Sequence, residues 1–427
     1  LFGLAPALQA ARTELNDGLK ESRLSKASGR PRLQLRNALV VAEVAMALML
    51  LIGAGLLAHS MVRLMNNRLG FEPAGQVRLQ LRLGDDAYSE EQRVAFTRDL
   101  LERIEALPGV SSAAAGWTVP FDFTGGGRCC WRTRFTFDPE AEPVASLVHP
   151  ITPGYFSSLG ATVLEGRELT WQDDALATPV PVLLNRTMAA RFFGGDSALG
   201  RQLSFKSQGE QVQTVVVGVV EDVRRWGLAA GDEESVYVPY LAFGGQQEDL
   251  KLMVRTEIPL NQAMADGLRS AVWDLDPRLP IASIVTMDQR ISSSLTEPRF
   301  YSFLLGSFAV LALVLAAAGI ASSLLYAVGR RSREMGIRIA VGAESGDLLQ
   351  LVLRQGMALT GLGLMAGIAG ATALSSALES MIYGITPTDP PTFLAVSALL
   401  ALVALGACLH PAWRAASTDP ASTLRAD

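Results

Sequence analysis

Residues 302–328 read SFLLGSFAVLALVLAAAGIASSLLYAV, a stretch without one charged side chain. A helix needs roughly 20 apolar residues to cross the hydrocarbon core of a bilayer. Three further segments approach or exceed this length, at 37–58, 356–378 and 392–409, and the first of them holds a single charge, Glu43. Charged residues make up 19% of the chain, and the mean hydropathy is +0.26, whereas soluble domains carry about 25% charge. The sequence therefore predicts an α-helical membrane protein with four transmembrane helices.

The charges that flank these segments predict their orientation. Basic residues are frequent before the first segment, and the loop between the second and third holds Arg330, Arg331, Arg333 and Arg338. Because cytoplasmic loops are enriched in Lys and Arg, we expect both stretches to lie inside the cell. The long stretch after the first segment then lies outside, where residues 66–300 carry 31 acidic and 22 basic side chains. This acidic excess, and a net charge of −5 for the chain, argue against a nucleic-acid partner.

The resulting layout alternates between the two sides of the membrane. A large outside domain covers 61–299, and a short outside loop covers 379–391. The four membrane helices are assigned to 37–60, 300–328, 351–378 and 392–410. The cytoplasmic parts are 1–36, a coupling segment at 329–350 and a tail at 411–427.

A repeat links the two ends of the chain. Residues 6–20, PALQAARTELNDGLK, match residues 411–425, PAWRAASTDPASTLR, at six positions without a gap. Repeats with a long period usually reflect duplicated units, although two alanine-rich tails can also match by chance. On the duplication hypothesis, residues 1–36 end a preceding unit, and the sequence is the C-terminal half of a longer, fused protein.

The outside domain alternates between strand and helix patterns. Alternating apolar residues predict a strand at 77–83. A Ser89-x-x-Gln92 capping box then opens a helix at 89–106, and a strand follows at 110–117. The same order of elements recurs at 251–255, 260–275 and 281–287. Two such halves predict a split βαβ, ferredoxin-like α+β domain, with a β-rich insertion at about 118–248.

Several kinds of chemistry lack their sequence motifs. The chain has no G-x-x-x-x-G-K-S/T phosphate loop and no G-x-S-x-G nucleophile motif. Its three histidines, His59, His149 and His410, lie far apart, and we expect His149 to be a turn residue because Pro150 follows it. We therefore expect no metal site, no cofactor bound by this chain and no catalytic activity.

The cysteines offer little for a disulfide framework. Cys129 and Cys130 are adjacent, and two packed or free thiols are favoured over a strained vicinal disulfide. Cys408 lies within the fourth membrane segment, where it is expected to act as a small apolar residue.

Two features inside the membrane segments suggest helix contacts. Glu43 is either a proton-relay group or, as we favour, a side chain that reaches the interface or a neighbouring helix. Gly363, Gly367 and Gly370 provide the small-residue spacing that permits close helix packing, which we favour over a role in gating.

The loop between the second and third membrane segments mixes cations with apolar residues. Besides its arginines it holds Met335, Ile337, Ile339 and Val341 before Gly342 interrupts the pattern. A basic amphipathic segment of this kind either lies on anionic lipid or docks in a groove of a cytoplasmic partner.

The string SREMGIRIAVGA at 332–343 resembles the FtsX-like permease domain of ABC transporters. The outside domain resembles the MacB-like periplasmic core domain in the strings YFSSLGATVLEGREL (155–169), VLLNRTMAARFFGG (182–195), LGRQL (199–203) and VVVGVVEDVRRWGL (215–228). Together the two resemblances cover about 37–425 in the family's order of helix, periplasmic domain and three helices.

The resemblance implies an ABC permease of the bacterial inner membrane that passes ATPase-driven motion to its periplasmic domain for export or extraction of a substrate. It assigns contact with a separate cytoplasmic ATPase, which would bind the ATP, to Arg333, Glu334, Met335, Gly336, Ile337, Arg338 and Gly342. It also implies a dimeric arrangement of two FtsX-like units, within one longer chain on the duplication hypothesis, and a possible periplasmic adaptor and outer-membrane channel as partners.

The sequence also bears on two other functions. An FtsX-like regulator, which controls a periplasmic partner without moving a substrate, shares the same architecture, so the sequence leaves it open as the alternative. A membrane-bound hydrolase lacks every nucleophile arrangement considered above. The identity of a substrate would be analogy only.

Overall fold

The computed structural model describes residues 29–84, 87–121, 131–137, 143–173, 178–207, 210–240, 249–331, 334–335, 337–338, 344–379 and 382–416. The chain divides into two compact units. One contains the described residues up to Arg63 and from Pro298 onward, and the other contains Leu64–Glu297. The repeat at 6–20 and the pair Cys129–Cys130 lie outside the described residues, so they stay predictions.

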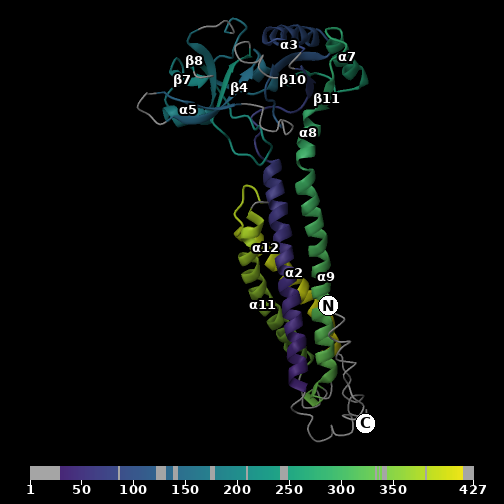
Figure 1. Cartoon of the computed structure of the whole chain (residues 1–427). Coiled ribbons are helices and arrows are strands. Elements are labelled where there is room, and N and C mark those ends of the chain that lie inside the picture. Colours follow the sequence, from purple (N-terminus) through teal and green to yellow (C-terminus); the bar gives the residue numbers. More distant parts are fainter. Residues whose placement is uncertain are drawn as a thin grey trace. The chain divides into compact units, whose positions relative to one another are not determined.

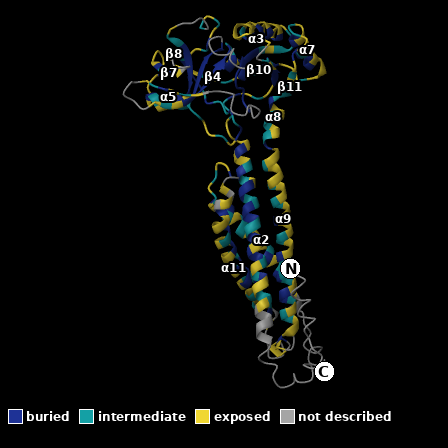
Figure 2. Ribbon diagram, viewed as in Figure 1, coloured by how far each residue is buried: buried dark blue, intermediate teal, exposed yellow. Residues whose placement is uncertain are grey.

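The first unit is built from four long helices, labelled in Figure 1: α2 (Gly29–Met65), α9 (Thr296–Arg330), α11 (Ser345–Leu378) and α12 (Pro390–Ala416). All four are long and apolar enough to cross a membrane, as the sequence predicts. Within its most apolar window α2 is 44% buried, against 17% for α9. Figure 2 shows this difference as yellow along much of α9. The helix α2 is therefore the central member of the bundle.

The second unit contains a four-stranded antiparallel core. Its strands are β1 (Gln76–Arg82), β2 (Val110–Gly116), β10 (Asp249–Thr256) and β11 (Ile281–Thr286), in the order β11-β1-β10-β2. The helices α3 (Glu90–Glu105) and α7 (Gln262–Trp273) contribute Leu100 and Leu268 to one hydrophobic core with Leu79 and Leu252 of this sheet. This order confirms the predicted split βαβ, ferredoxin-like arrangement.

Helix α3 begins where its sequence predicts. The Ser89 side chain accepts a hydrogen bond from the backbone N–H of Gln92, and the Gln92 side chain accepts one from the N–H of Ser89. This reciprocal capping box satisfies two of the donors that a helix start leaves without partners.

The insertion extends the same sheet with mixed pairing. Its strands are β3 (Trp131–Phe135), β4 (Val144–Ile151), β5 (Val163–Gly166), β6 (Val180–Asn185), β7 (Gln202–Ser207), β8 (Glu210–Val220) and β9 (Ser235–Pro239). The path β2-β4-β9-β6-β8-β5 joins the core sheet through the pair Gly116 and Ile151. Strands β4 and β9, and likewise β6 and β8, run parallel. Two short helices, α4 (Tyr155–Leu159) and α5 (Arg186–Phe193), complete it.

The insertion has a hydrophobic core of its own. Phe135, Val182, Met188, Phe205 and Val236 are all less than 3% exposed and lie in one cluster. The ferredoxin-like core and the insertion are thus separately packed parts of one sheet. A short helix, α8 (Met287–Ser294), follows β11, and Leu295 alone separates it from α9.

Candidate functional site

The predicted coupling segment is partly described. Arg333, Gly336 and Gly342 lie outside the described residues. Met335 is 4% exposed and belongs to the same hydrophobic core as Leu324 and Leu348 of the bundle, so it anchors the segment. Its backbone N–H donates to the carbonyl of Arg331 across 2.9 Å.

The other described residues predicted to contact the ATPase, Glu334, Ile337 and Arg338, are exposed. Ile337 is 49% exposed. Glu334 and Arg338 are also exposed and form an ion pair of 2.8 Å one helical turn apart. The structure therefore brings together one anchoring methionine and an exposed set of one apolar, one acidic and one basic side chain. A surface of this composition suits a groove in a partner protein better than it suits the interior of the bundle.

Helix α2 is attached to its neighbours near both ends. Near its start, the Arg36 guanidinium donates to the carbonyl of Ser322 and lies 4.5 Å from the ring centre of Tyr326, both on α9. Near its end, the Ser60 hydroxyl accepts from the backbone N–H of Tyr383 across 2.8 Å. Helix α2 is therefore in direct contact with both α9 and the segment before α12.

A polar cluster reinforces the second attachment. The Asp389 carboxylate accepts from the hydroxyl of Thr392 across 2.6 Å and from its backbone N–H across 3.2 Å, which caps the start of α12. The hydrogen bond from the Thr392 hydroxyl lowers the pKa of Asp389. The same carboxylate lies 3.1 Å from Nδ1 of His59 on α2.

The three glycines singled out on α11 all face α2. A Cβ at Gly363 would lie 2.6 Å from Val44, one at Gly367 would lie 2.9 Å from Leu48, and one at Gly370 would lie 2.5 Å from Met49. Since real Cβ atoms do not approach so closely, each glycine permits a backbone approach that a larger residue would prevent.

Glu43 and Cys408 make similar contacts with glycines. The Glu43 carboxylate occupies the space where a side chain at Gly319 of α9 would lie. This contact fits the predicted reach of Glu43 toward a neighbouring helix. Cys408 is fully buried and fills the space beside Gly356, as expected of a small apolar residue.

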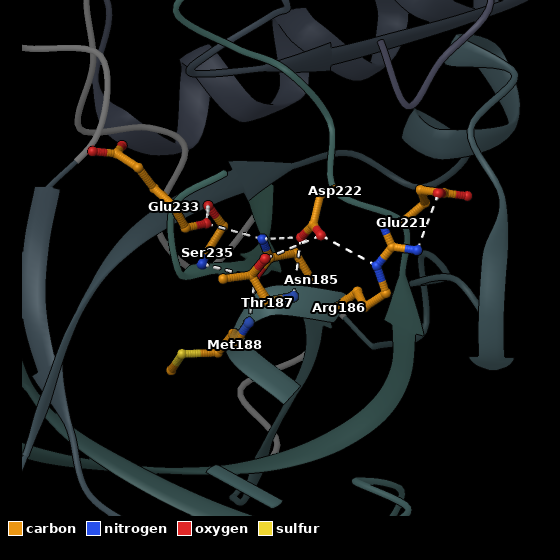
Figure 3. Close-up of polar contacts among 8 residues, drawn as sticks. All are labelled: Asn185, Arg186, Thr187, Met188, Glu221, Asp222, Glu233 and Ser235. Carbon is orange, nitrogen blue, oxygen red and sulfur yellow. Dashed lines mark hydrogen bonds and ion pairs between the residues drawn. The ribbon is translucent and has the colours of Figure 1, made fainter. Parts of the chain in front are cut away.

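A second candidate site lies in the insertion and centres on Asp222, whose carboxylate is drawn in Figure 3. It accepts from the Nδ2 of Asn185 across 2.5 Å, and from the backbone N–H and the hydroxyl of Thr187 across 3.0 Å each. Asp222 is 7% exposed. Because a buried carboxylate is costly without such donors, this network fixes the segment after β8 to the start of α5.

The neighbouring residue Arg225 is also buried and links two strands. Its guanidinium donates to Nε2 of His149 on β4 and, across 3.0 Å, to the hydroxyl of Tyr237 on β9. An arginine can only donate, so Nδ1 of His149 carries the ring proton and donates to the hydroxyl of Thr118 at 2.8 Å. Burial, with the nearby charge of Arg225, holds the pKa of His149 well below its usual value.

The prediction for His149 was wrong. The residue is fully buried within β4 and is not in a turn. Proline after it does not end the strand, because Pro150 and His149 continue the parallel pairing of β4 with β9. Sequence reasoning also assigned no role to Asp222 and Arg225, although both lie in the string 215–228 that carries the family resemblance and follow the apolar run Val215–Val220. No group of three metal-binding side chains occurs among the described residues.

Comparison with known proteins finds two family models in this chain. The MacB-like periplasmic core domain matches residues 38–269, and the FtsX-like permease C-terminal domain matches residues 306–420. The macrolide export ATP-binding/permease protein MacB 1/2 of Paracoccus denitrificans is 26% identical over 69% of this chain and 44% of its own length. The pyoverdine export ATP-binding/permease protein PvdT of Pseudomonas savastanoi pv. phaseolicola is 26% identical over 62% of this chain and 40% of its own.

The chain thus spans less than half the length of these curated relatives. Among solved structures, the periplasmic region of MacB from Actinobacillus actinomycetemcomitans is similar, with 16% identity and a TM-score of 0.36. The match covers 55% of this chain and 98% of that one.

Proposed function

Because the chain belongs to the MacB/FtsX-like family of ABC-transporter permeases, we propose that it carries ATPase-driven motion across the bacterial inner membrane to its periplasmic domain. That motion would serve the export or extraction of a substrate. The proposal assigns ATP hydrolysis to a separate cytoplasmic subunit, and these 427 residues themselves hold no phosphate-binding loop. Export or extraction of a substrate is part of this proposal, because the regions matched in these relatives cover less than half of their length.

The proposal rests on the arrangement of side chains in the coupling segment. Met335 is anchored in the bundle, while Ile337 and the Glu334–Arg338 pair remain exposed on the same short segment. A partner that binds Ile337 and pairs with the two charges would, when it moves, displace Met335 and hence the core of the bundle. In this proposal α2 receives that movement through Arg36 and through the contacts of its other end with Tyr383 and Asp389.

The covalent connection of two membrane helices to the periplasmic domain supports transmission of motion from the cytoplasmic side to the periplasmic side. Helix α2 leads into the periplasmic domain through residues 66–75, and α9 leaves it directly after α8. These two helices are therefore the covalent links between the membrane bundle and the periplasmic domain. Helices α11 and α12 are joined to each other by the short connection 379–389, so neither of them continues into the periplasmic domain.

The experiment is co-purification in detergent of the full-length permease with the candidate ABC ATPases of its genome. Wild type is compared with Arg338→Glu, and Arg98→Glu serves as the control. Arg98 lies in an exposed pair with Glu102 at the same i,i+4 spacing, but on α3 of the periplasmic domain. We expect Arg338→Glu to reduce the captured ATPase on the order of tenfold, as loss of a charge contact at an interface does, while Arg98→Glu retains it.

Capture of an ATPase by wild type and Arg338→Glu alike would overturn the coupling role of this residue. Capture of no ATPase by any form would overturn the transporter proposal. An FtsX-like regulator that acts on a periplasmic partner without an ATPase would then describe the chain better.

A further inference from the structure

Two connectors join the periplasmic domain to membrane helices. The first is residues 66–75, between α2 and β1, and the second is α8, which precedes α9. Both connectors belong to the unit Leu64–Glu297. Their contacts within that unit converge on one stretch of the insertion, residues 221–228, which we call the relay segment.

The first connector lies directly on the relay segment. The backbone N–H of Arg224 donates to the carbonyl of Leu69 across 3.0 Å, and Nε of Arg224 donates to the carbonyl of Arg68 across 3.1 Å. The Asn67 side chain donates to the carbonyl of Leu228 across 3.1 Å. Three consecutive residues of the connector are therefore bonded to one short segment.

Gly70 makes this close approach possible. Its φ of +74° lies in the left-handed region, which favours glycine. A Cβ at this position would collide with the carbonyl oxygen of Asp222. The connector and the relay segment are thus in direct backbone contact at Gly70.

The second connector reaches the relay segment through Phe121. Nη2 of Arg290 on α8 donates to the carbonyl of Phe121 across 3.0 Å, and the N–H of Phe121 donates to the carbonyl of Arg225 across 2.9 Å. Phe121 is fully buried and has a φ of +57°, a conformation that is costly for a bulky residue. Its ring also packs edge-on against Phe71 of the first connector, with 6.3 Å between the ring centres.

On its other side the relay segment is fixed to the core of the insertion. Asp222 binds Asn185 and Thr187 at the start of α5, as Figure 3 shows. Arg225 binds His149 on β4 and Tyr237 on β9. The segment has little regular structure of its own between β8 and β9, so these contacts determine its position.

We propose that residues 221–228 relay the movement of both membrane connectors to the insertion, and that Gly70 and Arg225 are its positioning residues. This inference rests on the proposed function. A displacement of α2 reaches Asp222 and Arg224 through Leu69 and Gly70, and a displacement of α9 reaches Arg225 through Arg290 and Phe121. The buried side chains of Asp222 and Arg225 then carry it to α5 and to β4 and β9.

The test measures hydrogen exchange in the full permease bound to its co-purified ATPase in nanodiscs. The nucleotide-free complex is compared with the complex trapped by ATP and vanadate. In wild type we expect exchange to change on the order of tenfold between the two states in peptides that contain the amides of Phe121 and Arg224. A peptide from 345–353, which overlaps the end of the coupling segment, should respond as well.

Gly70→Ala separates the connector from the relay segment. We expect it to reduce the nucleotide response at 221–228 to the part that arrives through Arg290 and Phe121, while the response at 345–353 persists. Gly75→Ala is the matched control, because Gly75 has a φ of +69° and a Cβ there would lie 2.6 Å from the carbonyl of Thr256 on β10, away from the relay segment. Asn67→Ala, which removes only the bond to Leu228, should reduce the response without the strain that Gly70→Ala adds.

The two proposals fail in different ways. If 345–353 responds to nucleotide in wild type and 221–228 does not, the relay is wrong and the proposed function stands. An equal response at 221–228 in Gly70→Ala, Asn67→Ala and wild type also overturns the relay. If no peptide responds although the ATPase is bound, the proposed function itself is wrong.

Discussion

The Glu334 carboxylate and the Arg338 guanidinium pair across 2.8 Å, and each side chain is about half exposed, at 51% and 50%. An exposed pair of this kind contributes only about 0.5 kcal/mol to the stability of a helix. Its stability contribution is too small to explain why both charges flank the exposed Ile337, whereas recognition by a partner would account for them.

Exchange of the two charges tests this interpretation. The double variant Glu334→Arg/Arg338→Glu keeps an i,i+4 pair but reverses the signs that a partner would meet. We expect thermal stability in detergent to match wild type and ATPase capture to stay as low as in Arg338→Glu. Recovery of capture in the double variant would show that the pair serves only the helix.

The glycine contacts of α11 predict a packing effect at Gly367. Gly367→Val would place branched carbons against Leu48, where a Cβ alone would already lie at 2.9 Å. Overpacking of this kind costs about 1–3 kcal/mol. Gly361→Val on the same helix is the control, because no atom lies within 4 Å of a Cβ there. The melting temperature of the purified permease should fall for Gly367→Val and stay unchanged for Gly361→Val; equal melting temperatures would contradict the close contact with α2.

The hydrogen bonds of Asp222 predict that its replacement destabilises the periplasmic domain. Asp222→Ala would leave the Nδ2 of Asn185 and the hydroxyl of Thr187 without their shared acceptor. Loss of a buried charged partner costs about 2–4 kcal/mol. Limited proteolysis should therefore cut the insertion faster in Asp222→Ala than in Asp196→Ala, which changes an exposed carboxylate. Identical cleavage rates would mean that the network does not hold this segment.

His149 predicts a pH dependence of stability. Its folded-state pKa is depressed because the ring is buried beside Arg225, so the unfolded chain takes up a proton first as the pH falls. The stabilisation is complete above the unfolded pKa of about 6.5 and decreases below it by about 1.4 kcal/mol per pH unit. Denaturant unfolding between pH 7.5 and 5 should show this slope in wild type and lose it in His149→Gln. If wild type and His149→Gln show the same slope, titratable groups other than His149 cause it.

Much of the fold could be predicted from local patterns. The long apolar runs determine the four membrane helices, and the capping box at Ser89 marks the start of α3. Alternation at β1 and the recurrence of strand, helix and strand also gave the ferredoxin-like order. These features depend on residues that are close in sequence, where periodicity carries the information.

The buried polar contacts could not be predicted in the same way. Asp222 and Asn185 are 37 positions apart, and Arg225 and His149 are 76 apart. Only the folded sheet brings these residues together. From the sequence alone, the proline after His149 indicated a turn. The relay segment was visible as part of a resemblance at 215–228, but nothing in its composition indicated that residues 67–70 would lie on it.

The most direct test of the central claim is a distance measurement between the two connectors. Spin labels are placed at Asn66→Cys and Ser293→Cys, both exposed positions, after Cys129→Ser, Cys130→Ser and Cys408→Ala remove the native thiols. The full complex with its ATPase is compared without nucleotide and with ATP and vanadate. We expect a distance distribution that shifts on trapping and fails to shift in Arg338→Glu. One unchanged distribution in both states, while the bound ATPase turns over ATP, would contradict transmission of motion to the periplasmic domain.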